Sequence, residues 1–360
     1  MDTPMGKLRQ LMEQEQLDGF LATQPENRRY LSGFSGSNGV LIISPTRQVI
    51  ATDFRYYEQV RQECPGWELA EVGYDFAGKM LELLRELELG GRRVGFEAAH
   101  LSVTTLLAWE QALQGRLVLV HTAGLVEQLR QQKDPAEVAS LRKAIAVAEE
   151  AFEHVLAWLQ PGLTERQVAW ELESYMRTHG ASNVSFEVIV ASGPNGALPH
   201  ARPTGRPLQP GEPIIFDFGC IVDGYCSDLT RTVCLGEPAG DTYLAVWHKV
   251  LEAQQAAFQG AKAGLTGQAI DKLARDIIAQ AGYGDNFGHA LGHGVGLAIH
   301  EIPRFSFYYP EEIPAGAVVT VEPGIYLPEW GGVRLEDMVL VRPEGVEILT
   351  QAPKQAVKPE

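Results

Sequence analysis

Two aspartates lie on either side of a turn in a strongly apolar part of the chain. Asp217 and Asp228 flank residues 222–224, and the surrounding valines, isoleucines and phenylalanines predict two paired strands. Pairing Ile221 with Gly224 would set the register of this hairpin. The two aspartates would then face each other with Cβ atoms roughly 5 Å apart. Buried carboxylates that close require a protonated carboxyl group, a basic side chain between them, or a cation.

A second pair of acidic residues repeats this pattern towards the end of the chain. Glu322 and Glu336 flank another turn, and each lies in a strand-like apolar segment, residues 318–326 and 333–340. A single glutamate in such a place is more typical of the protein surface. Two carboxylate hairpins in one domain instead predict a shared site.

Three of the nine histidines, His289, His293 and His300, fall within twelve residues between the two acidic pairs. Gly292 and Gly294 enclose the middle one, and a glycine-lined histidine allows the backbone to approach a bound ion closely. The spacing does not match the zincin motif, in which two histidines lie four apart on one helix. We therefore predict His293 as a ligand beside the four carboxylates.

Four carboxylates and one imidazole form a hard-to-borderline ligand set. Such a set suits Mn, Mg or Fe(II), and one histidine also admits Co and Zn. The four carboxylates carry a charge that two divalent ions balance. Two ions about 3.5–4 Å apart can activate a water molecule and polarise a carbonyl group. The chemistry indicated is metal-assisted hydrolysis.

The N-terminal third of the chain has the alternation of an α/β domain. Short Val-, Ile- and Leu-rich segments predict strands, and longer segments between them predict helices. The strands are expected at residues 17–22, 40–43, 49–52, 93–96 and 117–120, and helices at 76–89 and 103–113. A boundary is indicated where Asp134 caps a helix that begins at Pro135. We therefore predict two domains, residues 1–130 and 131–360.

The second domain repeats one order of elements. A helix from Pro135 stops at Pro161, and a second, opened by a capping box at residues 164–167, ends at Gly180. Strand-rich sequence follows, and then a second helix pair is expected at residues 241–263 and 266–281, before further strands. The order helix, helix, strands therefore occurs twice, which indicates an internal duplication in an α+β domain.

Composition and charge exclude several classes of protein. The 360 residues are 45% hydrophobic and 21% charged, which is typical of a globular protein and excludes a disordered or collagen-like chain. A net charge of −16 disfavours nucleic-acid and anionic-membrane partners. No apolar stretch predicts a transmembrane helix or a signal peptide. The four cysteines form no Cys-x-x-Cys pair, and we expect a reducing cytoplasm.

The five predicted ligands occur in the order found in a known family. Asp217, Asp228, His293, Glu322 and Glu336 resemble the metal ligands of the proline-specific peptidases with the pita-bread fold, Xaa-Pro dipeptidase (prolidase) and aminopeptidase P. The flanking residues match too, at 217–219, 227–232, 292–296, 321–324 and 334–337, and residues 52–56 resemble the creatinase-like N-terminal domain. The resemblance implies an α/β creatinase-like domain followed by a duplicated, pseudo-twofold pita-bread catalytic domain.

The resemblance assigns a role to each ligand. It implies that Asp217 binds one metal ion and that Asp228 and Glu336 bridge two. His293 and Glu322 would complete the coordination of the second ion, and Glu322 would also transfer the proton of the attacking water. The cofactor implied is two divalent ions per subunit, with Mn as the first candidate and Co, Zn or Fe as alternatives.

Four further residues are placed around the substrate by the same resemblance. His200 and His300 would contact it as catalytic residues, with His300 stabilising the tetrahedral intermediate. His289 would line the pocket or serve as a structural histidine. Arg334 would bind near the substrate and pair with ligand carboxylates. The aromatic candidates for a proline pocket are Phe186, Tyr225, Phe287 and Tyr326.

The predicted activity is hydrolysis of the peptide bond between an N-terminal residue and proline, by a homodimer acting on small peptides. A dipeptidase needs an anchor for the proline carboxylate, and an aminopeptidase needs open space beyond proline. The candidate anchors are Arg202, Arg206, Arg304, and Arg28 or Arg29 from a partner subunit. Methionine aminopeptidase, creatinase and a non-catalytic peptide-binding relative are the rival identifications. The intact ligand set and the N-terminal domain disfavour them.

Overall fold

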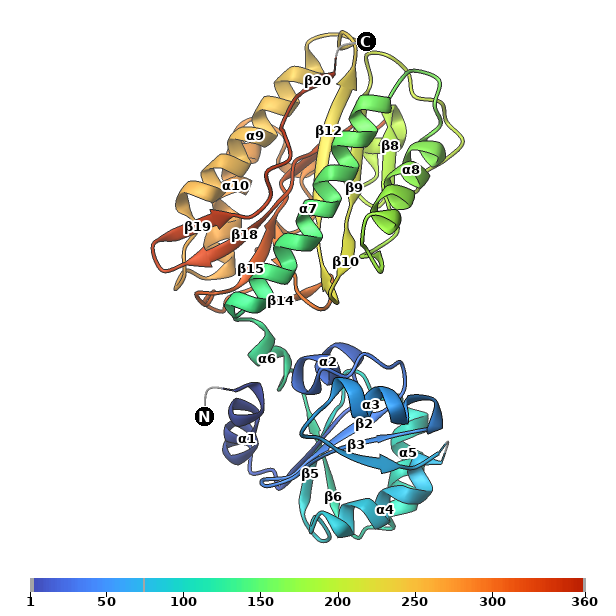
Figure 1. Ribbon diagram of the computed structural model, residues 1–360. Coiled ribbons are helices and arrows are strands. Elements are labelled where there is room, and N and C mark those ends of the chain that lie inside the picture. The colour runs from blue at the N-terminus through green and yellow to red at the C-terminus, as the bar shows by residue number, and fades with distance from the viewer. Residues whose placement is uncertain (1–2, 74, 359–360) are drawn as a thin grey trace. The chain divides into compact units, whose positions relative to one another are not determined.

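The computed structural model describes residues 3–73 and 75–358 of the chain. The chain divides into two compact units, Met1–Arg130 and Gln131–Glu360 (Figure 1). Among the described residues, no helix combines the length and the apolar character needed to cross a membrane.

The N-terminal unit is a mixed six-stranded sheet with helices on both faces. Its strand order is β4-β3-β2-β1-β5-β6. The strands are β1 (Gly19–Ala22), β2 (Val40–Ile43), β3 (Gln48–Thr52), β4 (Glu68–Glu71), β5 (Arg93–Glu97) and β6 (Val118–Thr122). The helices are α1 (Pro4–Gln14), α2 (Pro25–Ser32), α3 (Tyr57–Glu63), α4 (Phe76–Glu86), α5 (Val103–Leu113) and α6 (Glu127–Arg130).

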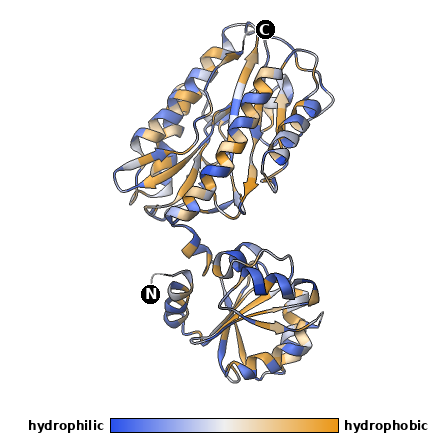
Figure 2. Cartoon of the chain, in the orientation of Figure 1, coloured by the Kyte–Doolittle hydropathy of each residue, from blue (hydrophilic) through white to orange (hydrophobic). Residues whose placement is uncertain are grey.

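Two apolar cores cover the two faces of this sheet. One core contains Leu8 of α1 and Val60 of α3, and the other contains Met80 of α4 and Trp109 of α5. The central strands are accordingly hydrophobic along most of their length (Figure 2). All five predicted strands of the N-terminal domain are present. The sequence analysis missed β4, because this half-exposed edge strand carries a glutamate at each end.

The C-terminal unit contains two pairs of helices. They are α7 (Pro135–Trp158), α8 (Glu165–Thr178), α9 (Thr242–Gly260) and α10 (Gly267–Gln280). Thr164 forms the predicted capping box of α8, and Asp134 is the predicted N-cap of α7, where it also forms a capping box with Glu137. Phe152 of α7 packs on Phe218 in the core of the first half, whereas α9 and α10 lie side by side over the core of the second half (Figure 1).

The strands of this unit form mostly antiparallel sheets, with one parallel pair where residues 357–358 meet residues 234–235. Sheet orders are β20-β12-β9-β8, β11-β10-β7, β14-β13-β15-β18-β19 and β16-β17. The first half holds β7 (Asn183–Val184), β8 (Ile189–Ser192), β9 (Pro213–Phe218), β10 (Cys220–Val222), β11 (Tyr225–Cys226) and β12 (Leu229–Leu235). The second half holds β13 (Gly292–Gly294), β14 (Glu301–Phe305), β15 (Val318–Val321), β16 (Gly324–Leu327), β17 (Gly331–Arg334), β18 (Asp337–Arg342) and β19 (Gly345–Ile348), and β20 (Val357–Lys358) returns to β12. The predicted order of helices and strands therefore does occur twice.

The predicted register of the first hairpin is wrong. Asp217 lies opposite Thr230, not opposite Asp228. The chain turns through Asp223 and Gly224, whose φ angles are 51° and 82°. Two consecutive residues at positive φ form the two-residue loop at 223–224, one residue later than the loop implied by the predicted pairing, so each partner moves by two positions. Because side chains alternate along a strand, a shift of two leaves Asp228 on the predicted face.

Candidate metal centre

One cavity of about 490 Å³ in the C-terminal unit gathers the predicted site residues. Its walls include all five predicted ligands and the four residues predicted around the substrate. These are Asp217, Asp228, His293, Glu322 and Glu336, with His200, His289, His300 and Arg334. The nine residues come from both halves of the unit. The duplication therefore builds the cavity at the junction between its two copies.

The second carboxylate hairpin places its glutamates opposite each other. Val321 pairs with Asp337 and Gly324 pairs with Arg334, and continuing that register sets Glu322 opposite Glu336. Neither glutamate belongs to a strand, because each lies where the ladder between the two strands is interrupted. The two glutamates are thus held by the strands that precede and follow them, and their backbone amides donate to the carbonyls of Leu291 and Thr230.

Three ligand groups converge within a few ångströms. Ligand atoms of Asp228, His293 and Glu336 all lie within 4.8 Å of one another. The His293 Nε2 atom is 3.5 Å from Asp228 Oδ2 and 3.4 Å from Glu322 Oε1. Within the described parts of the chain, no other group of three or more histidine, cysteine, aspartate and glutamate side chains is this compact.

Arg334 and two threonines hold the carboxylates in place. Arg334 Nη2 donates to Asp217 Oδ2 at 2.6 Å, and its Nε donates to Thr230 Oγ1 at 3.1 Å. The Thr230 hydroxyl in turn donates to Glu336 Oε2 at 2.6 Å. Thr320 Oγ1 donates to Glu322 Oε1 at 3.1 Å. Three of the four carboxylates are thereby oriented from outside the cavity, as expected around a metal ion.

The electrostatics of the site favour a bound cation. Burial, followed by the neighbouring carboxylates, raises the pKa of Asp228 and that of Glu336 well above their usual values. Burial also raises the pKa of Glu322 to about 7. Desolvation lowers the pKa of His293 to about 3, so its imidazole is neutral and can bind a metal. One arginine does not balance this many buried carboxylates, and the donor set therefore fits divalent ions.

These pKa shifts predict a strong dependence of metal affinity on pH. Carboxyl groups with raised pKa values hold protons that a metal ion must displace, so affinity for Mn²⁺ is expected to rise between pH 5.5 and pH 8. Each proton released should tighten the apparent Kd by about tenfold per pH unit. Isothermal titration calorimetry in two buffers of different ionisation enthalpy would count the protons. An affinity independent of pH over this range would contradict the prediction.

The three clustered histidines have different surroundings. His289 Nδ1 lies 2.8 Å from the Ala290 carbonyl, so this nitrogen carries the proton and Nε2 accepts from the Tyr326 hydroxyl at 2.9 Å. His300 packs edge-on against His293 with ring centroids 4.4 Å apart, and burial lowers its pKa. His289 is thus engaged in a hydrogen-bond chain, and His300 lines the cavity beside a predicted ligand.

The supporting residues of the site were not predicted from the sequence. Thr230 lies two residues after Asp228, and Thr320 lies two residues before Glu322. Arg231 donates to the backbone carbonyl of Glu336 at 2.5 Å. A hydroxyl residue two positions from a predicted ligand is the signal that could have found the two threonines.

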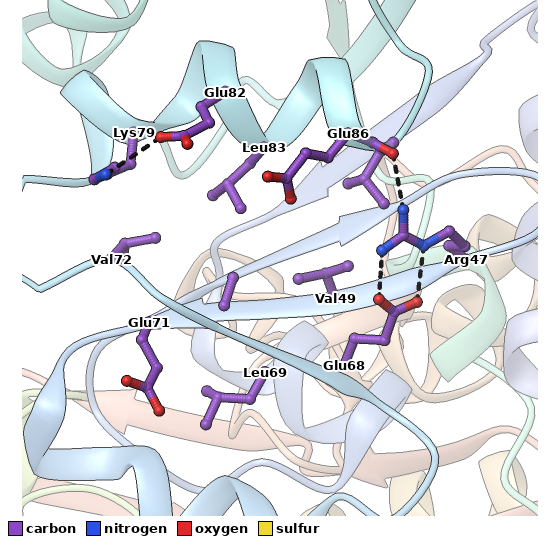
Figure 3. Close-up of a pocket in the computed structure, with 12 residues that line it drawn as sticks. Arg47, Val49, Glu68, Leu69, Glu71, Val72, Lys79, Glu82, Leu83 and Glu86 are labelled. Atoms are coloured by element: carbon purple, nitrogen blue, oxygen red, sulfur yellow. Dashed lines mark hydrogen bonds and ion pairs between the residues drawn. The ribbon is translucent and has the colours of Figure 1, made fainter.

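A second cavity, of about 260 Å³, lies in the N-terminal unit between β4 and α4 (Figure 3). Figure 3 shows Arg47 donating to both carboxylate oxygens of Glu68 and to the Glu86 carbonyl. Lys79 pairs with Glu82 at 3.2 Å on the opposite wall. These charged groups are exposed and pair with one another, and the walls hold no histidine or cysteine. The hydrolytic chemistry therefore belongs to the first cavity.

Comparison with protein families matches both units. Residues 139–343 match metallopeptidase family M24, and residues 5–132 match the creatinase/prolidase N-terminal domain. The matched ranges together cover most of the chain, and the first contains all nine residues around the cavity.

Individual relatives are similar over the full length. A solved Xaa-Pro dipeptidase from Bacillus anthracis shares 41% identity with a TM-score of 0.94, covering 98% of each chain. An X-Pro aminopeptidase from Thermotoga maritima shares 38% identity with a TM-score of 0.88, covering 96% of this chain and 98% of its own. An uncharacterized peptidase of Bacillus subtilis is 40% identical over 98% of each chain.

Proposed function

Since the chain belongs to metallopeptidase family M24, with a creatinase/prolidase N-terminal domain, we propose that it is an Xaa-Pro dipeptidase. The family matches confirm the resemblance seen in the sequence, and the solved relatives confirm the expected fold class. The observation that carries the proposal is the single cavity that gathers the ligand set, three further histidines and three arginines. The Xaa-Pro dipeptidase of Bacillus anthracis supports the same substrate class.

Two divalent ions would be held by the four carboxylates and His293. In this proposal Asp217 would hold one ion, His293 and Glu322 would hold the other, and Asp228 and Glu336 would serve both. The carboxylate-rich set favours Mn, with Co, Zn and Fe as alternatives. When bound, the ions supply a water molecule of lowered pKa and polarise the carbonyl group of the scissile bond.

The remaining steps are assigned to side chains of the cavity. Glu322 Oε1 accepts from Thr320, which leaves Oε2 to take the proton of the attacking water and pass it to the proline nitrogen. His300, kept neutral by burial, would donate an N–H to the developing oxyanion. His200 would orient the substrate from the opposite wall. Arg334 fixes Asp217 and Thr230 instead of contacting substrate, since its donors reach protein acceptors.

Among the predicted carboxylate anchors, Arg304 is best placed. It lines the cavity and lies opposite His293 in the β13–β14 pair. By contrast, Arg206 pairs with Glu212 at 2.7 Å, and Arg28 is buried and donates to the Gly36 and Gly39 carbonyls. Arg202 also lines the cavity, but its side chain is 83% exposed, beside Glu187. A half-buried guanidinium in the cavity next to the ligands favours a dipeptide that ends in proline.

Substitution of Arg304 by alanine tests the choice between dipeptidase and aminopeptidase. The wild type, loaded with Mn²⁺, is expected to cleave Ala-Pro faster than Ala-Pro-Ala. Arg304→Ala should lower kcat/KM for Ala-Pro by about 30- to 100-fold, because a charge-assisted hydrogen bond to the carboxylate contributes about 2–3 kcal/mol. The loss on Ala-Pro-Ala should be much smaller.

Arg202→Ala is the matched control, because it removes an exposed guanidinium from the same cavity. It should change neither rate by more than about threefold, as an exposed charge contributes little. Equal wild-type rates on Ala-Pro and Ala-Pro-Ala would instead assign the aminopeptidase activity.

We also propose that the enzyme is a cytoplasmic homodimer. The four cysteines, all free and buried, suit a reducing compartment. Light scattering on the metal-loaded protein would measure the oligomeric state, and a monomeric mass would contradict the dimer.

A further inference from the structure

Glu165, the first residue of α8, is completely buried and has no role in the proposed reaction. Its Oε1 accepts hydrogen bonds from the backbone and the hydroxyl of Ser192, at 2.7 and 2.9 Å. Its Oε2 accepts from Asn195 Nδ2 at 2.9 Å, and from the backbone and hydroxyl of Thr204, at 2.8 and 2.6 Å. Five donors therefore converge on one carboxylate.

All five donors belong to one connection, residues 192–204 between β8 and β9, which we call the His200 loop. It contains the 3-10 helix η2 (Gly193–Ala197) and brings His200 to the wall of the metal cavity. Asn195 Nδ2 also donates to the Arg202 carbonyl at 3.1 Å, across the loop. Glu165 thus holds the loop before and after the histidine.

Capping of α8 does not require this carboxylate. Thr164 and Gln167 already form a capping box at the start of the helix. The backbone amide of Glu165 is bonded to the Arg206 carbonyl at 3.1 Å. The carboxylate is therefore available to accept hydrogen bonds from the loop. The adjacent helix N-terminus also favours a negative charge at this position.

We propose that Glu165 is the positioning residue of His200. Its carboxylate fixes both ends of the His200 loop, and Arg334, which donates to the Pro199 carbonyl at 3.2 Å, fixes the middle. The loop then presents the imidazole of His200 to the substrate in one orientation. The assignment rests on the proposed function, in which His200 contacts the substrate. Misplacement of such a group by about 1 Å is enough to lower the rate about 100-fold.

A double-mutant cycle tests this assignment on the metal-loaded enzyme. Glu165→Gln keeps the volume of the side chain but replaces one acceptor oxygen by an N–H₂ donor, which opposes the loop donors. We expect it to lower kcat/KM for Ala-Pro by about 10- to 100-fold, with unchanged metal content. In a His200→Ala background the same substitution should lower kcat/KM by less than about twofold, because the imidazole that Glu165 positions is absent there.

Hydrogen exchange gives a readout that does not depend on activity. Glu165→Gln should accelerate amide exchange of residues 193–204 by at least about tenfold. Glu149→Gln is the matched control, since Glu149 also accepts a backbone bond, from Ala352 at 2.7 Å, but lies outside the His200 loop. It should leave both the exchange of residues 193–204 and the rate unchanged. Thr204→Val, which removes one donor only, should act like Glu165→Gln with a smaller effect.

Three outcomes would overturn the proposal. The first is an equal loss of activity from Glu165→Gln in the wild type and in the His200→Ala background. The second is unchanged amide exchange of residues 193–204 in Glu165→Gln. The third applies if that variant does not fold, and is unchanged amide exchange of the same residues in Thr204→Val. If the wild type hydrolyses no Xaa-Pro peptide, the proposed function fails. The exchange measurements still decide whether Glu165 holds the loop.

Discussion

Asparagine in place of Asp228 is expected to abolish hydrolysis of Ala-Pro, lowering kcat/KM by about 1,000-fold or more. Asp228 is buried, its ligand atom lies with those of His293 and Glu336, and the neighbouring carboxylates raise its pKa. The neutral amide removes a negative ligand that two ions are proposed to share. A factor of 1,000 corresponds to about 4 kcal/mol of transition-state stabilisation, which is within the contribution of a metal centre.

Metal content measured by mass spectrometry should fall in parallel with activity in Asp228→Asn. Asp223→Asn is the matched control, because Asp223 lies on the same hairpin but at its exposed tip, paired with Lys143 at 2.7 Å. That variant should keep its metal and its rate. Full metal occupancy and near-normal turnover in Asp228→Asn would contradict the ligand assignment.

Replacement of Arg231 by methionine is expected to destabilise the protein by about 3–5 kcal/mol, because it removes a fully buried guanidinium from the carboxylate of Asp337 and leaves Lys354 as the remaining cation of that pair. Arg231 Nη2 donates to Asp337 Oδ1 at 2.8 Å, and the two side chains are 2% and 0% exposed. The same guanidinium also donates to the carbonyls of Thr230, Glu336 and Ala352. Chemical denaturation of the metal-free protein would measure the loss.

An exposed ion pair provides the control for this prediction. Arg342 pairs with Glu347 on the hairpin of β18 and β19, with both side chains substantially exposed. Arg342→Ala should cost less than about 1 kcal/mol, since water screens such pairs. If Arg231→Met were no more destabilising than Arg342→Ala, the buried pair would not be what joins β12 to β18.

The helices and strands, and the convergence of the ligand residues on one cavity, were predicted from the sequence better than the register in which the strands pair. Apolar periodicity and capping residues located α7 and α8, because these signals act within a few neighbouring residues. The register of the first hairpin was wrong because it depends on which two residues form the loop, and the apolar pattern fits a loop at 222–223 as well as the observed loop at Asp223 and Gly224. This error does not affect the prediction that Asp217 and Asp228 share a site, because a shift of two residues leaves both side chains on the same face of the hairpin.

The supporting polar residues could not be predicted in the same way. Glu165 lies 27 residues before Ser192 in sequence, and its carboxylate meets the His200 loop only once α8 has packed on the sheet. Thr230 reaches Glu336 across 106 residues. Such bonds depend on tertiary packing: a polar residue beside a ligand can be marked as a candidate in the sequence, but its partner cannot be identified there.

Hydrogen bonds cross between the two copies of the repeat, and neither copy holds the complete site. The first copy contributes Asp217 and Asp228, while the second contributes the imidazole and the two glutamates. Arg334 and Thr230 each reach from one copy to a carboxylate of the other. Either half of the C-terminal unit produced alone would keep part of the ligand set without the side chains that orient it, and is therefore expected to be inactive.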